Sequence, residues 1–155
     1  MDEIKNELVI KANNLVEGFI NMTHNEYRLT LYLISKIKKD DKQFRIQRIS
    51  TKEFSELIGC DKDIYSYMKN LSISLLSRKI SVLYKNRDRL HINWFSYTKY
   101  IANKGLLEVA FNKDLSPFLL NIDQAYTKFF LNNVRKMKSK YSVRIYELLK
   151  QYEKI

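Results

Sequence analysis

Residues 50–111 constrain the fold of this chain most strongly, because two short helical patterns joined by a tight turn are followed there by strand-like runs. The segment Ser50-Thr51-Lys52-Glu53 has the form of a capping box, in which side-chain oxygens satisfy the free backbone N–H groups at a helix start. Gly59 suits the left-handed position that ends many helices. We therefore expect a first helix between Ser50 and Gly59, and a second helix from Asp61 to Arg78.

The second expected helix has two different faces. Ile64, Met68, Leu71 and Leu75 recur at the spacing of one helix face, which favours burial of that face. The opposite face carries small polar and basic side chains, and such a face suits insertion into the major groove of DNA. The residues that we expect to face the groove are Lys62, Ser66, Lys69, Asn70, Ile73, Ser77 and Arg78.

The segment from Ile80 to Phe111 predicts three strands, because apolar and polar residues alternate along it. The first two strands form a hairpin whose tip carries Lys85, Arg87 and Arg89, which we expect to contact DNA phosphates. Two helices followed by a basic β-hairpin is the layout of a winged-helix domain. The predicted fold class is therefore α+β: a winged helix-turn-helix, mostly helical, with a small antiparallel sheet as its wing.

The positive charge of the chain coincides with this segment. The formal net charge is +11, and residues 36–104 hold sixteen lysines and arginines against seven acidic residues. A local excess of this kind attracts a polyanion, either nucleic acid or an anionic membrane surface, although lysine-rich surfaces also simply keep proteins soluble. Because the charge follows the candidate DNA-binding unit, double-stranded DNA is the favoured partner. A helix pair that serves only packing is the alternative.

The residue types give little support to an enzyme. Cys60 is the only cysteine, so an internal disulfide and a cysteine-based zinc site are excluded. His24 and His91 lie far apart and have no neighbour at metal-ligand spacing. Three glycines leave no phosphate-binding loop. We expect no catalytic residue, no cofactor and no metal. No apolar run reaches the ~18–20 residues of a membrane span, so we expect a cytoplasmic protein with no membrane partner.

The remaining residues complete one expected domain, 1–155. A second capping box at Thr23–Glu26 predicts a helix to about Lys39, and Phe44 to Ile49 predicts a short strand. The other expectations are a strand at 8–10, a helix or turn over 13–20, a helical pattern over 118–138, and a helix from Ser139 marked by Tyr141, Ile145, Leu148 and Tyr152.

The run from Trp94 to Ile101 has bulky side chains on both faces of its expected strand. One face can pack on the helices. The other face requires either a second subunit or burial on both sides within the monomer, and the residue pattern leaves both open. A homodimer is therefore among the expected states.

Several segments carry a more specific signal. They read NNLV at 13–16 followed by TxxExRL at 23–29, ISTKEFSELIG at 49–59, LLSRKI at 75–80, FNKDLSPFL at 111–119 and KSKYSVRIYELLK at 138–150. In this order they resemble the N-terminal winged-helix domain of plasmid replication initiator proteins, the Rep type that starts theta replication at iteron-bearing origins. The last segment is the most specific, and the resemblance covers nearly the whole chain.

The resemblance implies a function and a domain organisation. Proteins of this type have two tandem winged-helix domains, of which the first serves dimerisation and mainly phosphate contacts, and the second reads much of the iteron. This chain corresponds to the first domain, without the second. We therefore expect a homodimer that binds double-stranded origin DNA to start replication, with host replication proteins as further partners. The alternatives are a winged-helix transcriptional regulator, including an autorepressor, and a dimerisation module without specific DNA binding.

Overall fold

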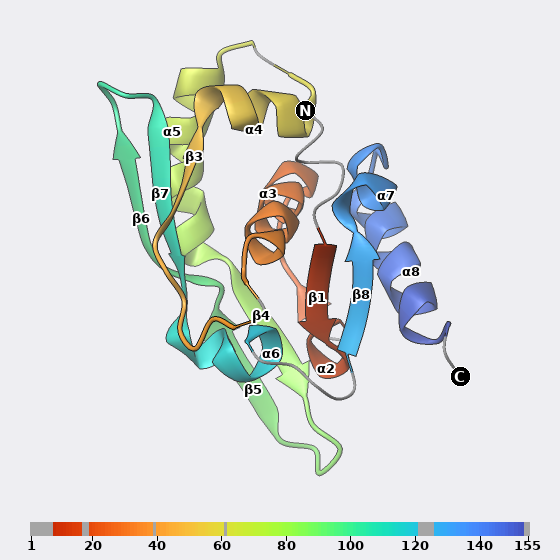
Figure 1. Cartoon of the computed structure of the whole chain (residues 1–155). Coiled ribbons are helices and arrows are strands. Elements are labelled where there is room, and N and C mark those ends of the chain that lie inside the picture. The colour runs from red at the N-terminus through yellow and green to blue at the C-terminus, as the bar shows by residue number, and fades with distance from the viewer. Residues whose placement is uncertain (1–7, 17–18, 39, 61, 121–125, 154–155) are drawn as a thin grey trace.

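A computed structural model describes residues 8–16, 19–38, 40–60, 62–120 and 126–153 of the 155-residue chain (Figure 1). Helix α3 lies at the centre, between a three-stranded sheet with helices α4 and α5 on one side and the strand pair β1–β8 with helix α8 on the other (Figure 1). The hairpin β4–β5 projects from the end of the molecule opposite to α4 (Figure 1).

The helices are mostly short. Their bounds are α2 (Asn13–Val16), α3 (His24–Ser35), α4 (Thr51–Ile58), α5 (Ile64–Ser74), α6 (Ser116–Leu119), α7 (Leu131–Arg135) and α8 (Lys140–Gln151), with single 3-10 turns η1 (Leu75–Ser77) and η2 (Lys113–Leu115). The strands are β1 (Leu8–Ala12), β2 (Phe19–Ile20), β3 (Gln47–Ser50), β4 (Lys79–Leu83), β5 (Arg89–Asn93), β6 (Phe95–Ile101), β7 (Leu106–Phe111) and β8 (Tyr126–Phe130).

The strands form three separate antiparallel sheets, with orders β1-β8, β2-β4-β5 and β3-β7-β6. The prediction of one small sheet was therefore wrong, although the mixed α+β class is correct. The run expected to form three strands folds as two hairpins, β4–β5 and β6–β7, which belong to different sheets. Trp94 stands between the hairpins and is fully buried, so the chain turns from one sheet to the other around this side chain.

Helix α3 is the core of the molecule, because nearly all of its faces are covered. Its start is the capping box predicted from the sequence: the Thr23 hydroxyl accepts from the Glu26 N–H, and the Glu26 carboxylate accepts from the Thr23 N–H. Leu29, Leu31 and Leu33 are all buried, so apolar side chains point to opposite sides of the helix. A helix that is apolar all round requires neighbours on every side, and this one has them. It ends at Ser35, earlier than expected.

The α4–α5 pair follows the sequence prediction in its main features. The Ser50–Glu53 capping box is present in both directions, and Gly59 ends α4 with φ +71°. The predicted buried stripe of the second helix is buried at all four positions. The start of this helix was predicted too early, since α5 begins at Ile64 and Lys62 lies in the preceding turn. The expected start, Asp61, lies outside the described residues.

Three other expectations were wrong. Tyr126–Phe130 was expected in a helical pattern but is strand β8, in which Thr127 and Phe129 are buried while Lys128 and Phe130 are exposed. This period of two suits a strand, and β1 supplies its partner from the other end of the chain. Phe19–Ile20 is likewise a strand, which pairs with β4. Strand β3 begins at Gln47 rather than at Phe44.

Helix α8 was predicted correctly, but it is oriented unusually. Val143 and Glu147 face the core, whereas the apolar residues that mark the helix in the sequence are exposed. Among the described residues, no helix combines the length and apolar character needed to cross a membrane. Over the same described ranges, no group of three or more His, Cys, Asp or Glu residues could hold a metal ion.

Candidate nucleic-acid interface

The exposed side of α5 and the turn before it form one continuous surface. Its side chains share one property: they all point away from the core and are exposed. Even the apolar Ile73 is 72% exposed. A large aliphatic side chain with this exposure has no role in the packing of the monomer. We call this set the α5 surface, and it consists of Lys62, Ser66, Lys69, Asn70, Ile73 and Ser77.

The carboxylate of Glu26 braces the end of α5 against α3. It accepts from the Ser74 hydroxyl at 2.8 Å and forms an ion pair with Arg78 at 2.9 Å, besides closing the capping box of its own helix. Burial alone would raise the pKa of Glu26, but the N–H of Thr23, the Ser74 hydroxyl and the Arg78 guanidinium together hold it below the ordinary value. Glu26 therefore stays ionised and fixes where the α5 surface points.

Arg78 was predicted to face the DNA groove, and the structure places its side chain on Glu26. It is half-buried, with 24% of the side chain exposed, and its Nε lies 2.9 Å from the carboxylate. Arg78 N–H also donates to Leu75 O at the end of η1. The side chain thus has a structural partner inside the domain and is half-buried, whereas the six residues of the α5 surface are all exposed.

The C-terminal end of α4 is held by two arginines. Arg28 donates to Ile58 O at 3.3 Å and to Met137 O at 2.6 Å, and Arg135 donates to Glu56 O at 2.9 Å. The last carbonyls of a helix lack partners within the helix, so a cation there satisfies them and suits the helix dipole. These contacts fix α4, and with it the turn that leads into α5. They also explain why Arg28 follows the Thr23–Glu26 box in the sequence.

His24 supports the same junction. Its Nε2–H donates to Met137 O, with the two atoms 2.7 Å apart. Burial lowers the pKa of His24, and this effect and the nearby Arg28 charge outweigh the hydrogen bond to Met137, which raises it. The lowered pKa favours the neutral ring, in the tautomer whose Nε2 carries the proton that Met137 O accepts. His91 lies on β5, in the sheet β2-β4-β5, where it contacts the hydroxyl of Ser81 on β4.

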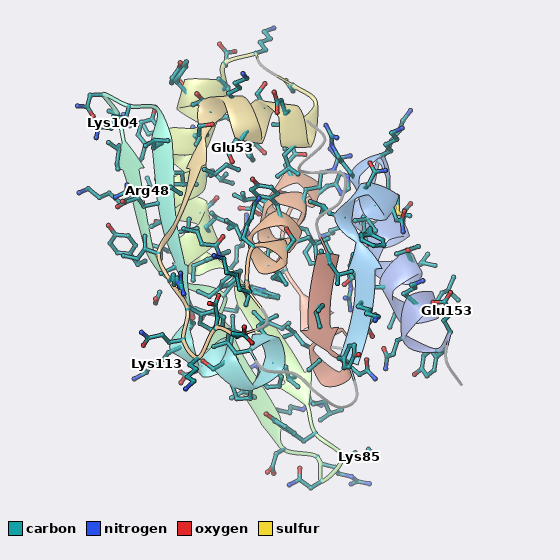
Figure 2. All side chains as sticks on the ribbon, viewed as in Figure 1. Arg48, Glu53, Lys85, Lys104, Lys113 and Glu153 are labelled. Atoms are coloured by element: carbon teal, nitrogen blue, oxygen red, sulfur yellow. The ribbon has the colours of Figure 1, made fainter. Side chains whose placement is uncertain are left out.

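The β6–β7 turn is docked against the start of both α4 and α5. The Thr51 N–H donates to Gly105 O at 3.0 Å. Gly105 has φ +57°, and a Cβ added there would lie 3.0 Å from a ring carbon of Tyr65. This close approach requires glycine. The docked turn holds Lys104 beside the first turn of α5. Figure 2 shows the Lys104 side chain at the end of this hairpin.

Lys104 was not among the residues expected to contact DNA. The sequence does carry a signal for it, because Lys104-Gly105 separates two alternating runs in the same way as the basic turn of the first hairpin. The signal alone does not say which hairpin is nearer to the helix pair. That depends on the pairing of β7 with both β3 and β6, which joins residues far apart in the chain.

The tip of the β4–β5 hairpin lies far from the α5 surface. Lys85, Arg87 and Arg89 are all exposed, and the turn is closed by the Tyr84 N–H donating to Asp88 O at 2.8 Å. Figure 2 shows Lys85 at one end of the molecule and Lys104 at the other. The predicted DNA-binding residues therefore form two separate groups. We call Lys85, Arg87 and Arg89 the β4–β5 tip.

The aromatic run at β6 is buried on one side only. Phe95 is in the core, whereas Tyr97 is 36% exposed on the outer face of the sheet, so burial of both faces within the monomer was the wrong alternative. The Tyr97 hydroxyl and Arg48 both donate to Glu108, at 3.0 and 2.7 Å. The hydrogen bond from Arg48, aided by that from Tyr97, lowers the pKa of Glu108. This outer face is a polar network rather than an apolar patch.

A buried ion pair ties the two ends of the chain together. Lys11 of β1 contacts Glu147 of α8, and both side chains are fully buried. Tyr27 of α3 accepts from Lys11 at 2.8 Å and donates to Glu147. Burial, together with the neighbouring Glu147 charge, raises the pKa of Tyr27 well above its usual value. The three side chains thus satisfy one another and fix which side of α8 faces the core.

These elements define a mixed α+β protein in which the buried carboxylate of Glu26 supports a helix surface that carries two lysines. A family model described as "Initiator Replication protein, WH1" matches residues 8–150. The chain belongs to this family of replication initiators.

Individual relatives agree with this family. The chain is 25% identical over 148 residues to a "Replication initiation protein" of Escherichia coli, and the match covers 92% of this chain and 46% of the relative. The chain thus spans less than half the length of this relative. Among solved structures, the Pi initiator protein in complex with iteron DNA matches with a TM-score of 0.72 at 18% identity, over 96% of this chain and 65% of that one. This second likeness concerns the fold alone.

Proposed function

We propose that this chain is a winged-helix domain of a plasmid replication initiator and that it binds double-stranded DNA at origin repeats. In this proposal α4 and α5 are the helix-turn-helix, the sheet β3-β7-β6 supports them, and the β6–β7 turn is the wing. The β4–β5 hairpin, which the sequence suggested as the wing, is then an insertion between α5 and that sheet. Family membership and the likeness to an initiator solved with iteron DNA support the proposal.

The observation that carries the proposal is the α5 surface. It presents two lysines, three small polar side chains and an exposed isoleucine on one side of a helix whose other side is buried. Amide side chains such as Asn70 can pair with adenine, and aliphatic side chains such as Ile73 can contact the thymine methyl group. In this proposal Lys62, Lys69 and Lys104, which are all exposed, neutralise the phosphates on either side of the groove.

The remaining parts of the proposal follow from the family. The β4–β5 tip supplies a second set of phosphate contacts, and the active form is a homodimer that cooperates with host replication proteins. Plasmid DNA lies in the cytoplasm of a bacterial cell, so we place the protein there. We propose no catalytic residue and no cofactor.

Binding to duplex origin repeats, compared with scrambled DNA across a salt series, tests the proposal. We expect a preference for the repeats that persists at physiological salt. Asn70→Ala and Ile73→Ala should reduce this preference by about 1–3 kcal/mol for each lost base contact, and they should leave binding to scrambled DNA nearly unchanged. Both side chains are exposed, so the fold should be unaffected.

Lys62→Ala/Lys69→Ala should instead weaken binding to both DNAs, because phosphate contacts carry no sequence information. Lys136→Ala is the matched control, since this exposed lysine follows α7 on another side of the molecule. Equal binding of repeats and scrambled DNA by the wild-type chain, with no effect of Asn70→Ala, would contradict base reading by α5. Equal effects of Lys136→Ala and the α5 variants would contradict the assignment of the surface.

A further inference from the structure

We propose that the hydroxyl group of Tyr65 is a further DNA contact, which donates a hydrogen bond to a backbone phosphate at the edge of the groove. Tyr65 is the second residue of α5, and it is 59% exposed although its ring is large and aromatic. Its hydroxyl has no hydrogen-bond partner among the residues that the structure describes. This inference rests on the proposed function, because it adds a residue to the DNA-binding side of α5.

The position of Tyr65 around α5 places it on a flank of the α5 surface. Ser66 and Asn70 lie near the centre of that surface, and Tyr65 is about 100° around the helix from Ser66. Lys69 follows Tyr65 by four residues and lies on the same flank. A helix in the major groove presents its centre to the base edges and its flanks to the backbones of the two strands. This position favours a phosphate over a base as the partner of Tyr65.

The flank that carries Tyr65 faces the β6–β7 hairpin. A Cβ atom added to Gly105 would lie 3.0 Å from ring carbon Cε1 of Tyr65, so the ring packs directly on the turn. Seven residues after Tyr65, the carbonyl of Ser72 accepts a hydrogen bond from the Thr98 hydroxyl of β6. Tyr65 therefore lies where α5 meets the turn that carries Lys104, and the proposed function brings both of these elements to the DNA.

The turn holds the Tyr65 ring in place. Gly105 lies between this ring and Thr51, because a Cβ added to Gly105 would also lie 3.4 Å from the Thr51 hydroxyl oxygen. The N–H of Thr51 donates to Gly105 O at 3.0 Å, which anchors the turn on the start of α4. A ring that packs on an anchored turn loses little conformational freedom when its hydroxyl binds a ligand. Tyr65 thus presents a donor that is fixed before DNA arrives.

The other tyrosine of α5 provides the contrast. Tyr67 lies on the opposite flank, where its hydroxyl accepts a hydrogen bond from Asn25 at 3.3 Å. Its ring packs against Phe54, with the two ring centroids 5.6 Å apart. The polar and apolar parts of Tyr67 therefore both have partners within the domain. Tyr67 is the matched control, because it is an exposed tyrosine on the same helix with a structural role.

Tyr65→Phe tests the contact, because it removes the hydroxyl and keeps the ring on Gly105. Affinity for the duplex repeats and for scrambled duplex DNA is measured across a salt series. We expect Tyr65→Phe to weaken binding to both DNAs by about tenfold, since a phosphate contact carries no sequence information. The slope of log affinity against log salt should stay unchanged, because an uncharged hydroxyl releases no counterion. Tyr67→Phe should keep the wild-type affinity and slope.

The salt slope separates a contact from a merely structural role. If Tyr65 only positioned the β6–β7 turn, its alteration would displace Lys104 and lower the slope by up to about 0.9. Such a lower slope would overturn the proposal, and so would wild-type affinity in Tyr65→Phe or an equal loss in Tyr67→Phe. Circular dichroism and thermal unfolding establish that Tyr65→Phe keeps the wild-type fold, as the exposure of Tyr65 predicts.

Duplexes that each carry one neutral methylphosphonate identify the group that accepts the hydrogen bond. On one of these duplexes we expect the wild type and Tyr65→Phe to bind equally tightly, because the charge that strengthens the hydroxyl contact is absent. A loss in Tyr65→Phe that persists on every such duplex would overturn a phosphate as the partner.

Gly105→Ala tests whether the turn fixes the hydroxyl. The added Cβ displaces the Tyr65 ring, so this change should reduce affinity less in the Tyr65→Phe background than in the wild type. Fully additive losses would overturn the fixed position of the hydroxyl.

The outcomes separate this inference from the proposed function. Equal binding of repeats and scrambled DNA by the wild type contradicts the proposed preference, yet a uniform loss in Tyr65→Phe at unchanged slope still supports the contact. A preference for the repeats with wild-type affinity in Tyr65→Phe supports the proposed function and overturns the contact. A wild-type chain that binds neither duplex overturns both.

Discussion

Glu26 shows how one side chain can connect the start of one helix with the end of another. Its carboxylate closes the capping box of α3 and also binds Ser74 and Arg78 at the end of the α5 segment. The capping box could be predicted from the sequence, because its partners are three residues apart. The bond to Arg78 could not, because it joins residues 52 positions apart. Arg78 was therefore predicted as a DNA contact, whereas its contact with Glu26 could not be predicted from the sequence.

The lowered pKa of Glu26 predicts how stability depends on pH. Its folded pKa lies below the ordinary value of 4.5, so its contribution is complete above that value and is lost as the pH falls through the folded pKa. Glu26→Gln keeps a residue that can complete a capping box but removes the charge. At neutral pH we expect the free energy of unfolding of this variant to be about 1–3 kcal/mol lower than that of the wild type. The difference from wild type should shrink below pH 4.5 in urea titrations, whereas a constant difference at every pH would contradict the assignment.

At the scale of elements, signals carried by a few consecutive residues were reliable, whereas features set by distant partners were missed. Both capping boxes and the Gly59 end of α4 were predicted correctly, since each depends on a few consecutive residues. Strand β8 was missed because its partner β1 pairs Val9 with Phe129, and no local pattern records such a distant contact. Helix α8 was predicted from its apolar stripe, yet the ion pair of Glu147 decides which face is buried.

The two glycines with positive φ offer a matched test of the β6–β7 turn. Gly59→Ala and Gly105→Ala should each cost about 1–2 kcal/mol, because both positions have left-handed backbone angles. Only at Gly105 would the added Cβ press on Tyr65, next to the α5 surface. We therefore expect Gly105→Ala alone to weaken DNA binding, measured by fluorescence anisotropy where both variants are fully folded. Equal losses of affinity would indicate that the turn does not position the interface.

Across the whole molecule, the lysines and arginines that we propose as DNA contacts lie on two different projections. The α5 surface and Lys104 lie at one end, and the β4–β5 tip lies at the other (Figure 2). The sequence predicted the α5 surface and the β4–β5 tip, but it predicted neither Lys104 as a DNA contact nor the separation of the two groups, because the two hairpins look alike as alternating runs with basic turns. Their separation follows from the sheet pairings, in which β4 and β5 join β2 while β6 and β7 join β3.

This separation predicts additive effects on the salt dependence of DNA binding. Each lost phosphate contact should reduce the slope of log affinity against log salt by about 0.9. Lys62→Ala/Lys69→Ala and Arg87→Ala/Arg89→Ala should each reduce it by roughly 1.8, and the four changes together by roughly 3.6, since distant sites act independently. An unchanged slope for Arg87→Ala/Arg89→Ala would show that the tip does not contact the same DNA.

The buried Lys11–Glu147 pair also bears on how the chain is made. Its two residues are 136 positions apart, and Tyr27 and Lys11 are both synthesised long before Glu147. Until α8 leaves the ribosome, a nascent chain that collapsed around α3 would enclose a lysine without its counter-charge, which is strongly unfavourable. We therefore expect strand β1 to close on α3 only after α8 has been translated. Chains that lack α8 should then be unable to reach the finished fold.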